Sequence, residues 1–528
     1  MRTTSEQSPP TLKHLYESIL RRYESETAIR FRGDMLTYGD LDDDSARLAS
    51  GLVDLGLELE DRVGVLTSNC PEYVVADIAL ARGGFAKVPL NDMLSATDIE
   101  YMLNNSGANT VIVGPQFEET IRSIASNVPT LERVITIDDT DGLGLGREFH
   151  VESFESMLES TEPVAPDPQI SKSTLAGVFH TGGTTGDPKG VKHTQENLAL
   201  NAFAHAVELD IQPRDTLLLM TPLPHSAGLI MAGGLTQGST HVITQGFDAE
   251  RALDIIEQQG ISWTFMVPTM VYRILDLLDE GTYDTSTLET LVYGAAPMKP
   301  DRLRDGLDTL GNVFLQFYGQ YETPDLITVL PKSAHDPDDE DRLSSCGIPT
   351  TMCEVEVVDE SGETVPPGQP GEIMARGAYS MEGYYEMPDE TAETMEDGWI
   401  HTGDIGKMDE DGYCYIVDRD SDVIVSGGMN VYSVTVEEVV QKHDQVANVA
   451  VIGVPDDEWG EAVKAVVVPK GGAVDRADIR AFCSDRLADY EVPKSVDIIE
   501  ELPTTPYGKL DKKQLREPYW EDQTRQIS

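Results

Sequence analysis

The chain has 528 residues, of which 40% are hydrophobic, and it carries a net charge of −54. This length exceeds what one hydrophobic core supports, and so large an excess of acid argues against a nucleic-acid-binding protein, which needs basic patches. No apolar run approaches the ~20 residues that cross a bilayer, and the amino terminus lacks the apolar stretch of a signal peptide. We therefore expect a cytoplasmic protein without a membrane span.

The acidic residues are spread along the whole chain, in stretches such as 40–48, 336–343 and 456–463. A short acidic tail favours disorder or a basic partner, whereas acid spread over a folded surface is typical of adaptation to high salt. The five cysteines form no C-x-x-C pair. Zinc and dithiol redox sites are therefore not expected, and the thiols are interpreted as small buried side chains.

Helical and strand patterns alternate from the first residues onward. Residues 27–41 predict two short strands around the turn at Gly33, and a helix, a buried strand and another helix beginning at Pro71 follow. Residues 137–170, rich in Gly, Pro and Ser, predict a surface excursion. From residue 173 the alternation resumes, with a helix capped by Thr194 and further strand candidates up to residue 296. This pattern predicts an α/β fold with parallel sheets.

The pattern changes twice in the second half. Residues 345–418 are rich in Gly and Tyr with alternating apolar positions, which favours a smaller antiparallel β region. Beyond residue 420 the order is helix, strand, strand, helix, strand. We predict a large amino-terminal domain, residues 1–420, of α/β layers with parallel sheets and a small β region, and a small mobile carboxy-terminal α+β domain, residues 421–528.

The stretch FHTGGTTGDPKGVKHT, residues 179–194, has the composition of a loop that wraps phosphates. Its glycines allow close approach to an anion, backbone N–H groups and threonine hydroxyls can donate to phosphate oxygens, and Lys189 adds charge. The Walker template G-x-x-x-x-G-K-[ST] fails in both registers, because the second required Gly falls on Asp187 or Pro188. A phosphate loop of another kind is expected.

FHTGGTTGDPKG resembles the [YF]-T-S-G-[ST]-T-G-x-P-K-G signature of the adenylate-forming superfamily, which includes the AMP-forming acyl-CoA synthetases. Further matching stretches follow in the family's order: PLPHSAGL (222–229), YGAAP (293–297), YGQYE (318–322), GEIMARG to MEGYY (371–385), GWIHTGD (398–404), YIVDRDSDVIVSGGMNVYSVTVEEV (415–439) and PTTPYGKLDKKQL (503–515). The resemblance spans nearly the whole chain. It implies that a carboxylate attacks the α-phosphate of Mg-ATP and that a thiol then displaces AMP.

The resemblance also implies roles for single residues. Glu322 ligates Mg²⁺, Lys509 stabilises charge at the α-phosphate, and His225 lines the acyl entrance. The ATP- and AMP-binding residues are Thr181, Gly182, Gly183, Thr184, Thr185, Gly186 and Lys189 for the β- and γ-phosphates, Gly294, Ala295, Ala296, Tyr318, Gly319 and Tyr321 near the adenine and α-phosphate, and Asp404 and Arg419 for the ribose. The acyl pocket is bordered by His225, Ala227, Gly228, Val267 and Gly319.

A structural alternative stays open for several of these residues. Asp404 could cap a turn, Tyr318 could be core, His225 could be structural and Lys509 could be a solvated lysine. Gly182 and Tyr321 also depart from the family pattern: Gly182 replaces a Ser, and Tyr321 replaces a Thr whose hydroxyl faces the α-phosphate. A phenol cannot occupy the space of that hydroxyl.

The second half-reaction is implied to need a rotation of the carboxy-terminal domain. Ser421 occupies the hinge position, where the family tends to have Lys or Asp, and Gly427 and Gly428 fit a tunnel for the pantetheine arm of CoA. The leading hypothesis is an ATP-dependent acyl-CoA ligase for a medium- or long-chain fatty acid or an aromatic acid. The alternatives are an enzyme that loads a carrier protein and a non-catalytic nucleotide sensor. ATP, Mg²⁺ and CoA are the expected cofactors, and a homodimer is the assembly considered.

Overall fold

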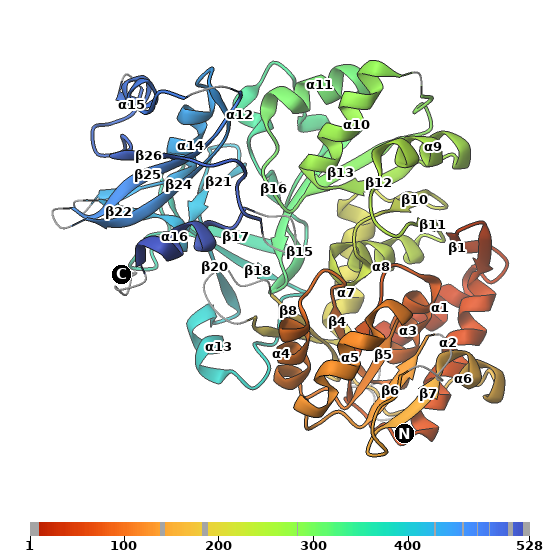
Figure 1. Ribbon diagram of the computed structural model, residues 1–528. Coiled ribbons are helices and arrows are strands. Elements are labelled where there is room, and N and C mark those ends of the chain that lie inside the picture. The colour runs from red at the N-terminus through yellow and green to blue at the C-terminus, as the bar shows by residue number, and fades with distance from the viewer. Residues whose placement is uncertain are drawn as a thin grey trace. The chain divides into compact units, whose positions relative to one another are not determined.

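The computed structural model describes residues 10–137, 143–181, 188–281, 283–426, 429–456, 459–471, 474–484, 486–504 and 510–520. These residues form two compact units (Figure 1). The first unit holds the described residues of Met1–Thr181, Pro188–Val355 and Ala375–Ile400, and the second holds those of Glu356–Met374 and His401–Ser528.

A seven-stranded sheet begins the first unit, in the order β7-β6-β5-β3-β4-β8-β9. All neighbours are parallel except β8 and β9. The strands are β3 (Arg62–Leu66), β4 (Ala86–Leu90), β5 (Thr110–Val113), β6 (Arg133–Thr136), β7 (His150–Ser153), β8 (Leu175–His180) and β9 (Gly190–Thr194). The predicted parallel sheet is confirmed. The excursion predicted at 137–170 is wrong in part, because β7 joins the sheet edge there and α6 (Phe154–Ser160) follows it.

A nine-stranded sheet completes the first unit, in the order β16-β15-β14-β13-β12-β10-β11-β1-β2. Its middle, from β14 to β1, is parallel, and both edges are antiparallel. The strands are β1 (Thr27–Phe31), β2 (Asp34–Thr37), β10 (Thr216–Leu219), β11 (Thr240–Ile243), β12 (Trp263–Met266), β13 (Thr290–Gly294), β14 (Phe314–Gln320), β15 (Thr323–Leu330) and β16 (Ile348–Pro349). The predicted hairpin at Gly33 is the β1–β2 pair.

One apolar core joins the two sheets. The helices α3 (Pro71–Gly83) and α8 (Gly228–Thr236) are apolar on nearly all sides and almost wholly buried, as expected of core helices. They belong to a cluster that also contains Val63 of the first sheet and Leu217 of the second. Helix α7 (Gln195–Glu208) packs on α8, and it begins at the predicted Thr194 with a capping box that includes Asn197.

The other helices of the first unit divide between three apolar clusters: α1 and α2 contribute to the core that joins the two sheets, α4 and α5 to a second cluster, and α9, α10 and α11 to a third. In the second cluster, α4 and α5 pack apolar side chains onto the outer face of the seven-stranded sheet (Figure 1). Their bounds are α1 (Leu12–Arg22), α2 (Tyr38–Asp54), α4 (Ala96–Ser106), α5 (Glu118–Ile124), α9 (Ala249–Gln259), α10 (Pro268–Glu280), α11 (Pro300–Leu310), α12 (Glu340–Leu343) and α13 (Pro388–Thr394). Among the described residues, no helix is both long and apolar enough to span a bilayer.

The predicted β region and the α+β class of the carboxy-terminal part are confirmed, but the predicted order there, helix, strand, strand, helix, strand, missed β22 and β23 before it and α16 after it. The β region is a sheet in the order β17-β18-β20-β19, with β21 paired to β20. In the second unit, α14 and α15 pack on one face of a further five-stranded sheet, while Leu515 of α16 belongs to a separate apolar cluster. The elements are β17 (Cys353–Val358), β18 (Gly371–Gly377), β19 (Met395–Glu396), β20 (Trp399–Met408), β21 (Cys414–Arg419), β22 (Ile424–Ser426), β23 (Met429–Val431), α14 (Ser433–Gln441), β24 (Val446–Asp456), β25 (Gly460–Pro469), α15 (Arg476–Ser484), β26 (Ser495–Ile498) and α16 (Lys512–Trp520).

Candidate active site

The expected phosphate loop connects two paired strands. β8 and β9 are antiparallel, with His180 opposite Gly190, so the loop leaves and returns at neighbouring positions. At its base, Thr181 N donates to the carbonyl oxygen of Lys189 at 3.0 Å, and Lys189 N lies 3.3 Å from Thr181 Oγ1. Five of the predicted loop residues, Gly182, Gly183, Thr184, Thr185 and Gly186, lie outside the described residues.

Tyr384 joins the end of this loop to Glu322. The Lys189 ammonium lies 4.9 Å from the centre of the Tyr384 ring, and the Tyr384 hydroxyl donates to Glu322 Oε1 at 2.7 Å. Glu322 is 7% exposed. Burial and then the charge of Glu322 raise the pKa of Tyr384 far above its usual range, so the phenol stays a donor. Tyr384 was not predicted as a site residue, although it lies in the quoted stretch MEGYY.

The predicted adenine- and acid-binding residues lie along one edge of the nine-stranded sheet. β10, β12, β13 and β14 are successive parallel neighbours, so their carboxyl ends share that edge. Each predicted residue lies at or after one of these ends: His225, Ala227 and Gly228 after β10, Val267 after β12, Gly294, Ala295 and Ala296 at β13, and Tyr318 and Gly319 in the last residues of β14. The structure therefore brings these residues to one place.

Close backbone contacts explain two of the glycines at this edge. A Cβ on Gly294 would lie 2.7 Å from the carbonyl oxygen of Phe317 in the neighbouring strand. A Cβ on Gly319 would lie 2.3 Å from the carbonyl carbon of Asp325. A larger residue at either position therefore requires the backbone to move. Ala295 adopts a positive φ of 64°, which turns the chain sharply at the end of β13.

Tyr321 is half-buried and lies among other rings. Its ring centre is 5.7 Å from that of Phe179 and 5.3 Å from that of His225, and its hydroxyl lies 3.5 Å from the carbonyl oxygen of Pro224. His193 Nε2 donates to the Tyr321 carbonyl at 2.8 Å. Burial lowers the pKa of His193 to about 4, so this ring is neutral at pH 7. Tyr321 thus connects the strand before the phosphate loop to the His225 segment.

The His225 segment is held by polar contacts from both sides. Asn69, which follows β3, donates to the carbonyl oxygen of Thr221 at 2.9 Å and accepts from Leu223 N at 2.8 Å. His225 itself has a non-helical backbone, with φ −122° and ψ −156°, inside a short π-helical turn, Leu223–Ala227. Its Nδ1 lies 3.0 Å from Ser226 Oγ. The ring is therefore fixed by neighbours, which accords with either a structural or a binding role.

In the second unit, Asp404 and Arg419 are cross-strand partners on β20 and β21. Arg419 Nε lies 3.6 Å from Asp404 Oδ1, and the Asp404 side chain is 13% exposed while that of Arg419 is 44% exposed. The predicted pair is thus brought together. Gly427, Gly428 and Lys509 lie outside the described residues.

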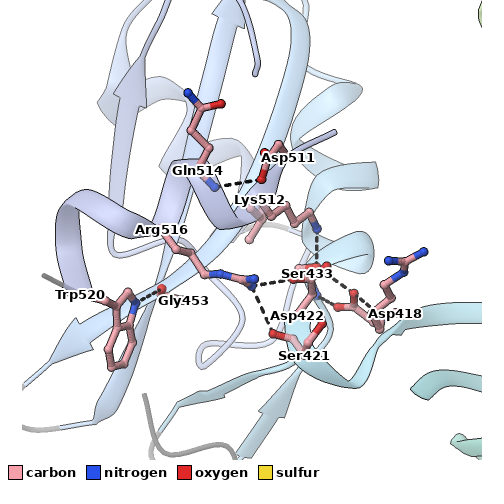
Figure 2. A network of polar contacts seen from close by, with 12 residues as sticks. Asp418, Ser421, Asp422, Ser433, Gly453, Asp511, Lys512, Gln514, Arg516 and Trp520 are labelled. Atoms are coloured by element: carbon pink, nitrogen blue, oxygen red, sulfur yellow. Dashed lines mark hydrogen bonds and ion pairs between the residues drawn. The ribbon is translucent and has the colours of Figure 1, made fainter. Parts of the chain in front are cut away.

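Helix α16 contacts the expected hinge within the same unit (Figure 2). Arg516 Nη1 donates to the carbonyl oxygen of Ser421 at 3.2 Å and to Asp422 Oδ1 at 2.5 Å. One turn earlier, Lys512 Nζ donates to Ser433 Oγ at 2.6 Å, and the Ser433 hydroxyl lies 3.0 Å from Asp418 Oδ1. The contacts made by α16 were not predicted, because they join segments 79 to 95 residues apart.

No compact metal centre is found among the residues that the structure describes, where no group of three or more His, Cys, Asp or Glu side chains could hold an ion. A single buried carboxylate still fits Mg²⁺, which usually takes one or two protein oxygens and completes its shell with water and substrate phosphates. Glu322, beside the end of the phosphate loop, meets that requirement.

Comparison with known proteins identifies the family. Residues 16–385 match the model of the AMP-binding enzyme family, and residues 435–509 match that of the AMP-binding enzyme C-terminal domain. The chain is 37% identical to the medium/long-chain-fatty-acid–CoA ligase FadD8 of Mycobacterium tuberculosis, over 98% of this chain and 92% of that protein. It is also 37% identical to a feruloyl-CoA synthase of an Amycolatopsis species, over 93% of this chain and 95% of that protein.

A solved structure supports the fold. The crystal structure of ATP-bound MatB from Rhodopseudomonas palustris has a TM-score of 0.85 and 29% identity to this chain, covering 97% of it and 99% of MatB. The predicted fold class, a large α/β domain with parallel sheets and a smaller α+β domain, is confirmed.

Proposed function

Because the chain belongs to the AMP-binding enzyme family, we propose that it is an ATP-dependent acyl-CoA ligase. The carboxylate of the acid attacks the α-phosphorus of ATP, which forms an acyl adenylate and releases pyrophosphate. The thiol of CoA then attacks the acyl carbon, the bond to the adenylate oxygen breaks, and AMP leaves. The enzyme class predicted from the sequence, an AMP-forming acid–thiol ligase, agrees with the relatives named as CoA ligases.

The observation that carries the proposal is the contact chain from Lys189 through Tyr384 to Glu322. It supplies a cation and a buried carboxylate at the end of a glycine-rich loop. We assign the β- and γ-phosphates to this loop and Mg²⁺ to Glu322. When bound, the ion neutralises phosphate charge, while Tyr384 keeps the carboxylate in place.

The remaining assignments follow the sequence. Tyr318 and the turn at Gly294–Ala296 contact the adenine, Asp404 and Arg419 hold the ribose, and Lys509 serves the α-phosphate. We divide the chain at residue 420, with Ser421 as the hinge about which the carboxy-terminal domain turns between the two half-reactions.

The acid is a medium- or long-chain fatty acid or an aromatic acid. Two relatives of equal identity are named for these two different classes, so similarity alone does not choose between them. The segment after β10 and Val267 after β12 border the pocket that makes the choice.

Incubation of the protein with Mg-ATP, CoA and a panel of fatty and aromatic acids tests the function. The proposal predicts AMP release that depends on both CoA and one class of acid, with the acyl-CoA identified by mass spectrometry. Pyrophosphate exchange without turnover of CoA would instead indicate a carrier protein as the acceptor. ATP binding with neither activity would leave a nucleotide sensor.

A further inference from the structure

A chain of buried polar contacts joins three elements of the first unit. Ser226, in the segment after β10, donates from Oγ to Asp325 Oδ1 of β15 at 2.9 Å. The other carboxylate oxygen, Asp325 Oδ2, lies 3.6 Å from His205 Nε2 of α7. His205 Nδ1 in turn lies 2.9 Å from the carbonyl oxygen of Asn201. At the opposite end, His225 Nδ1 lies 3.0 Å from Ser226 Oγ.

The acceptors in this chain determine where the protons lie. A carbonyl oxygen only accepts, so His205 Nδ1 carries a proton. Within the described part of the chain, His205 Nε2 and Asp325 Oδ2 have no hydrogen-bond partner, and they face each other. A proton on either His205 Nε2 or Asp325 Oδ2 avoids repulsion between the lone pairs of these two atoms. In both cases Asp325 Oδ1 remains an acceptor for the Ser226 hydroxyl.

This arrangement fixes the tautomer of His225. The Ser226 hydroxyl has one proton, and it points to Asp325. Its oxygen must therefore accept from His225, which places a proton on His225 Nδ1. In the neutral ring, Nε2 is then the nitrogen that accepts hydrogen bonds.

The backbone at Asp325 is sterically constrained by the neighbouring strand. This residue is 5% exposed and has a positive φ of 63°, a conformation that Asp tolerates better than most residues. The opposite strand approaches so closely that only Gly fits at position 319, and the β14–β15 register shifts between Tyr318 and Gln320. An unfavourable backbone conformation in a buried site persists only where the surroundings determine it.

We propose that Asp325 is a positioning residue for acid activation: through Ser226 it holds His225 as the Nδ1–H tautomer, with its ring beside Tyr321. The proposal rests on the proposed function only in assigning His225 to the acid entrance. His205 lies against the other carboxyl oxygen of Asp325.

The tautomer can be measured without any activity. Two-bond ¹H–¹⁵N correlation of ring-¹⁵N-histidine protein identifies the protonated nitrogen, and the signals missing in His225→Gln assign His225. The wild-type ring is expected as Nδ1–H, and Ser226→Ala is expected to move it toward Nε2–H. A wild-type Nε2–H ring, or an unchanged ring in Ser226→Ala, overturns the proposal.

Two further variants separate positioning from general damage. Asp325→Asn tolerates a positive φ, and its amide can accept from Ser226 and donate to His205 Nε2, so the Nδ1–H tautomer should persist. Its loss would overturn the proton assignment, including in the case where Ser226→Ala does not fold. Ser239→Ala is the matched control, because it removes a buried hydroxyl without a hydrogen-bond partner among the described residues; the His225 signals should not move.

Kinetics test the assignment to the acid entrance. Ser226→Ala should raise the KM for the acid about tenfold, the effect of one lost hydrogen bond, with an unchanged KM for ATP. Equal changes in both KM values would contradict the assignment. If the wild-type protein activates no acid at all, the proposed function fails while the tautomer result stands by itself.

Discussion

Replacing Tyr384 by Phe tests the contact chain on which the proposed function depends. The substitution removes one oxygen and leaves the ring over which Lys189 lies. Glu322, buried and 2.7 Å from the lost hydroxyl, keeps its charge but loses that donor. Hydrogen bonds to charged groups contribute about 1.5–3 kcal/mol, which corresponds to roughly 10- to 150-fold.

The loss should appear in the magnesium dependence. Residues that orient a metal ligand typically change metal affinity or activity by about 10–100-fold when mutated. We therefore expect Tyr384→Phe to raise the half-saturating Mg²⁺ concentration for ATP–pyrophosphate exchange by about tenfold or more. The KM for the acid should not change, because Tyr384 contacts the phosphate loop and Glu322 instead of the segment after β10.

Tyr379→Phe is the matched control. This buried phenol donates to the carbonyl oxygen of Leu326 at 2.6 Å and lies 2.8 Å from Thr350 Oγ1, so Tyr379→Phe also removes a hydrogen-bonded hydroxyl from a buried ring. Its magnesium dependence should remain that of the wild type. A folded Tyr384→Phe protein with an unchanged magnesium dependence would refute the assignment of Mg²⁺ to Glu322.

Three further predictions concern the stability of the fold. Arg516→Met leaves the largely buried Asp422 carboxylate without its cation, so the free energy of unfolding from urea titration should fall by about 3 kcal/mol. The double variant Arg516→Met, Asp422→Leu should recover part of this loss. Equal urea midpoints for the wild type and Arg516→Met would refute a stabilising role of the buried ion pair. Stability should fall as the pH drops from about 6.5 to about 4. Burial lowers the pKa of four histidines to about 4, so the unfolded chain binds protons first; they are His180, His193, His241 and His335. A flat pH profile of thermal unfolding would contradict this prediction. The melting temperature should rise between about 0.1 and 1 M KCl, because the Debye length falls from about 10 to about 3 Å and the net charge of −54 is screened. A melting temperature that falls with added KCl would contradict the interpretation of the acidic surface as adaptation to high salt.

Motifs and periodicity predicted the layers of this fold but not the order of its strands. The hairpin at Gly33, the Thr194 cap and the helix at Pro71 depend on local chemistry, so their residues are sufficient to predict them. The edge strand β7 was missed because its polar residues give no alternation, and pairing with β6 stabilises it instead.

The candidate site, too, was predictable where it depends on local motifs and not where it depends on distant contacts. The sequence motifs identified Glu322 and Lys189 as candidate site residues. The acid- and adenine-binding candidates lie at the ends of parallel strands, which bring them to one edge of the nine-stranded sheet. Tyr384 and Asp325 could not be assigned roles from sequence, because their roles depend on contacts with residues 62 and 99 positions away. Such contacts have no local signal in the sequence.

Isotope transfer tests the central claim most directly. The protein is incubated with Mg-ATP, CoA and an accepted acid whose carboxylate carries ¹⁸O, and the nucleotide product is analysed by mass spectrometry. If the carboxylate attacks the α-phosphorus and CoA then displaces AMP, one ¹⁸O atom appears in AMP and none in pyrophosphate. ADP as the product, or AMP without the label, would contradict an acyl-adenylate route for this chain.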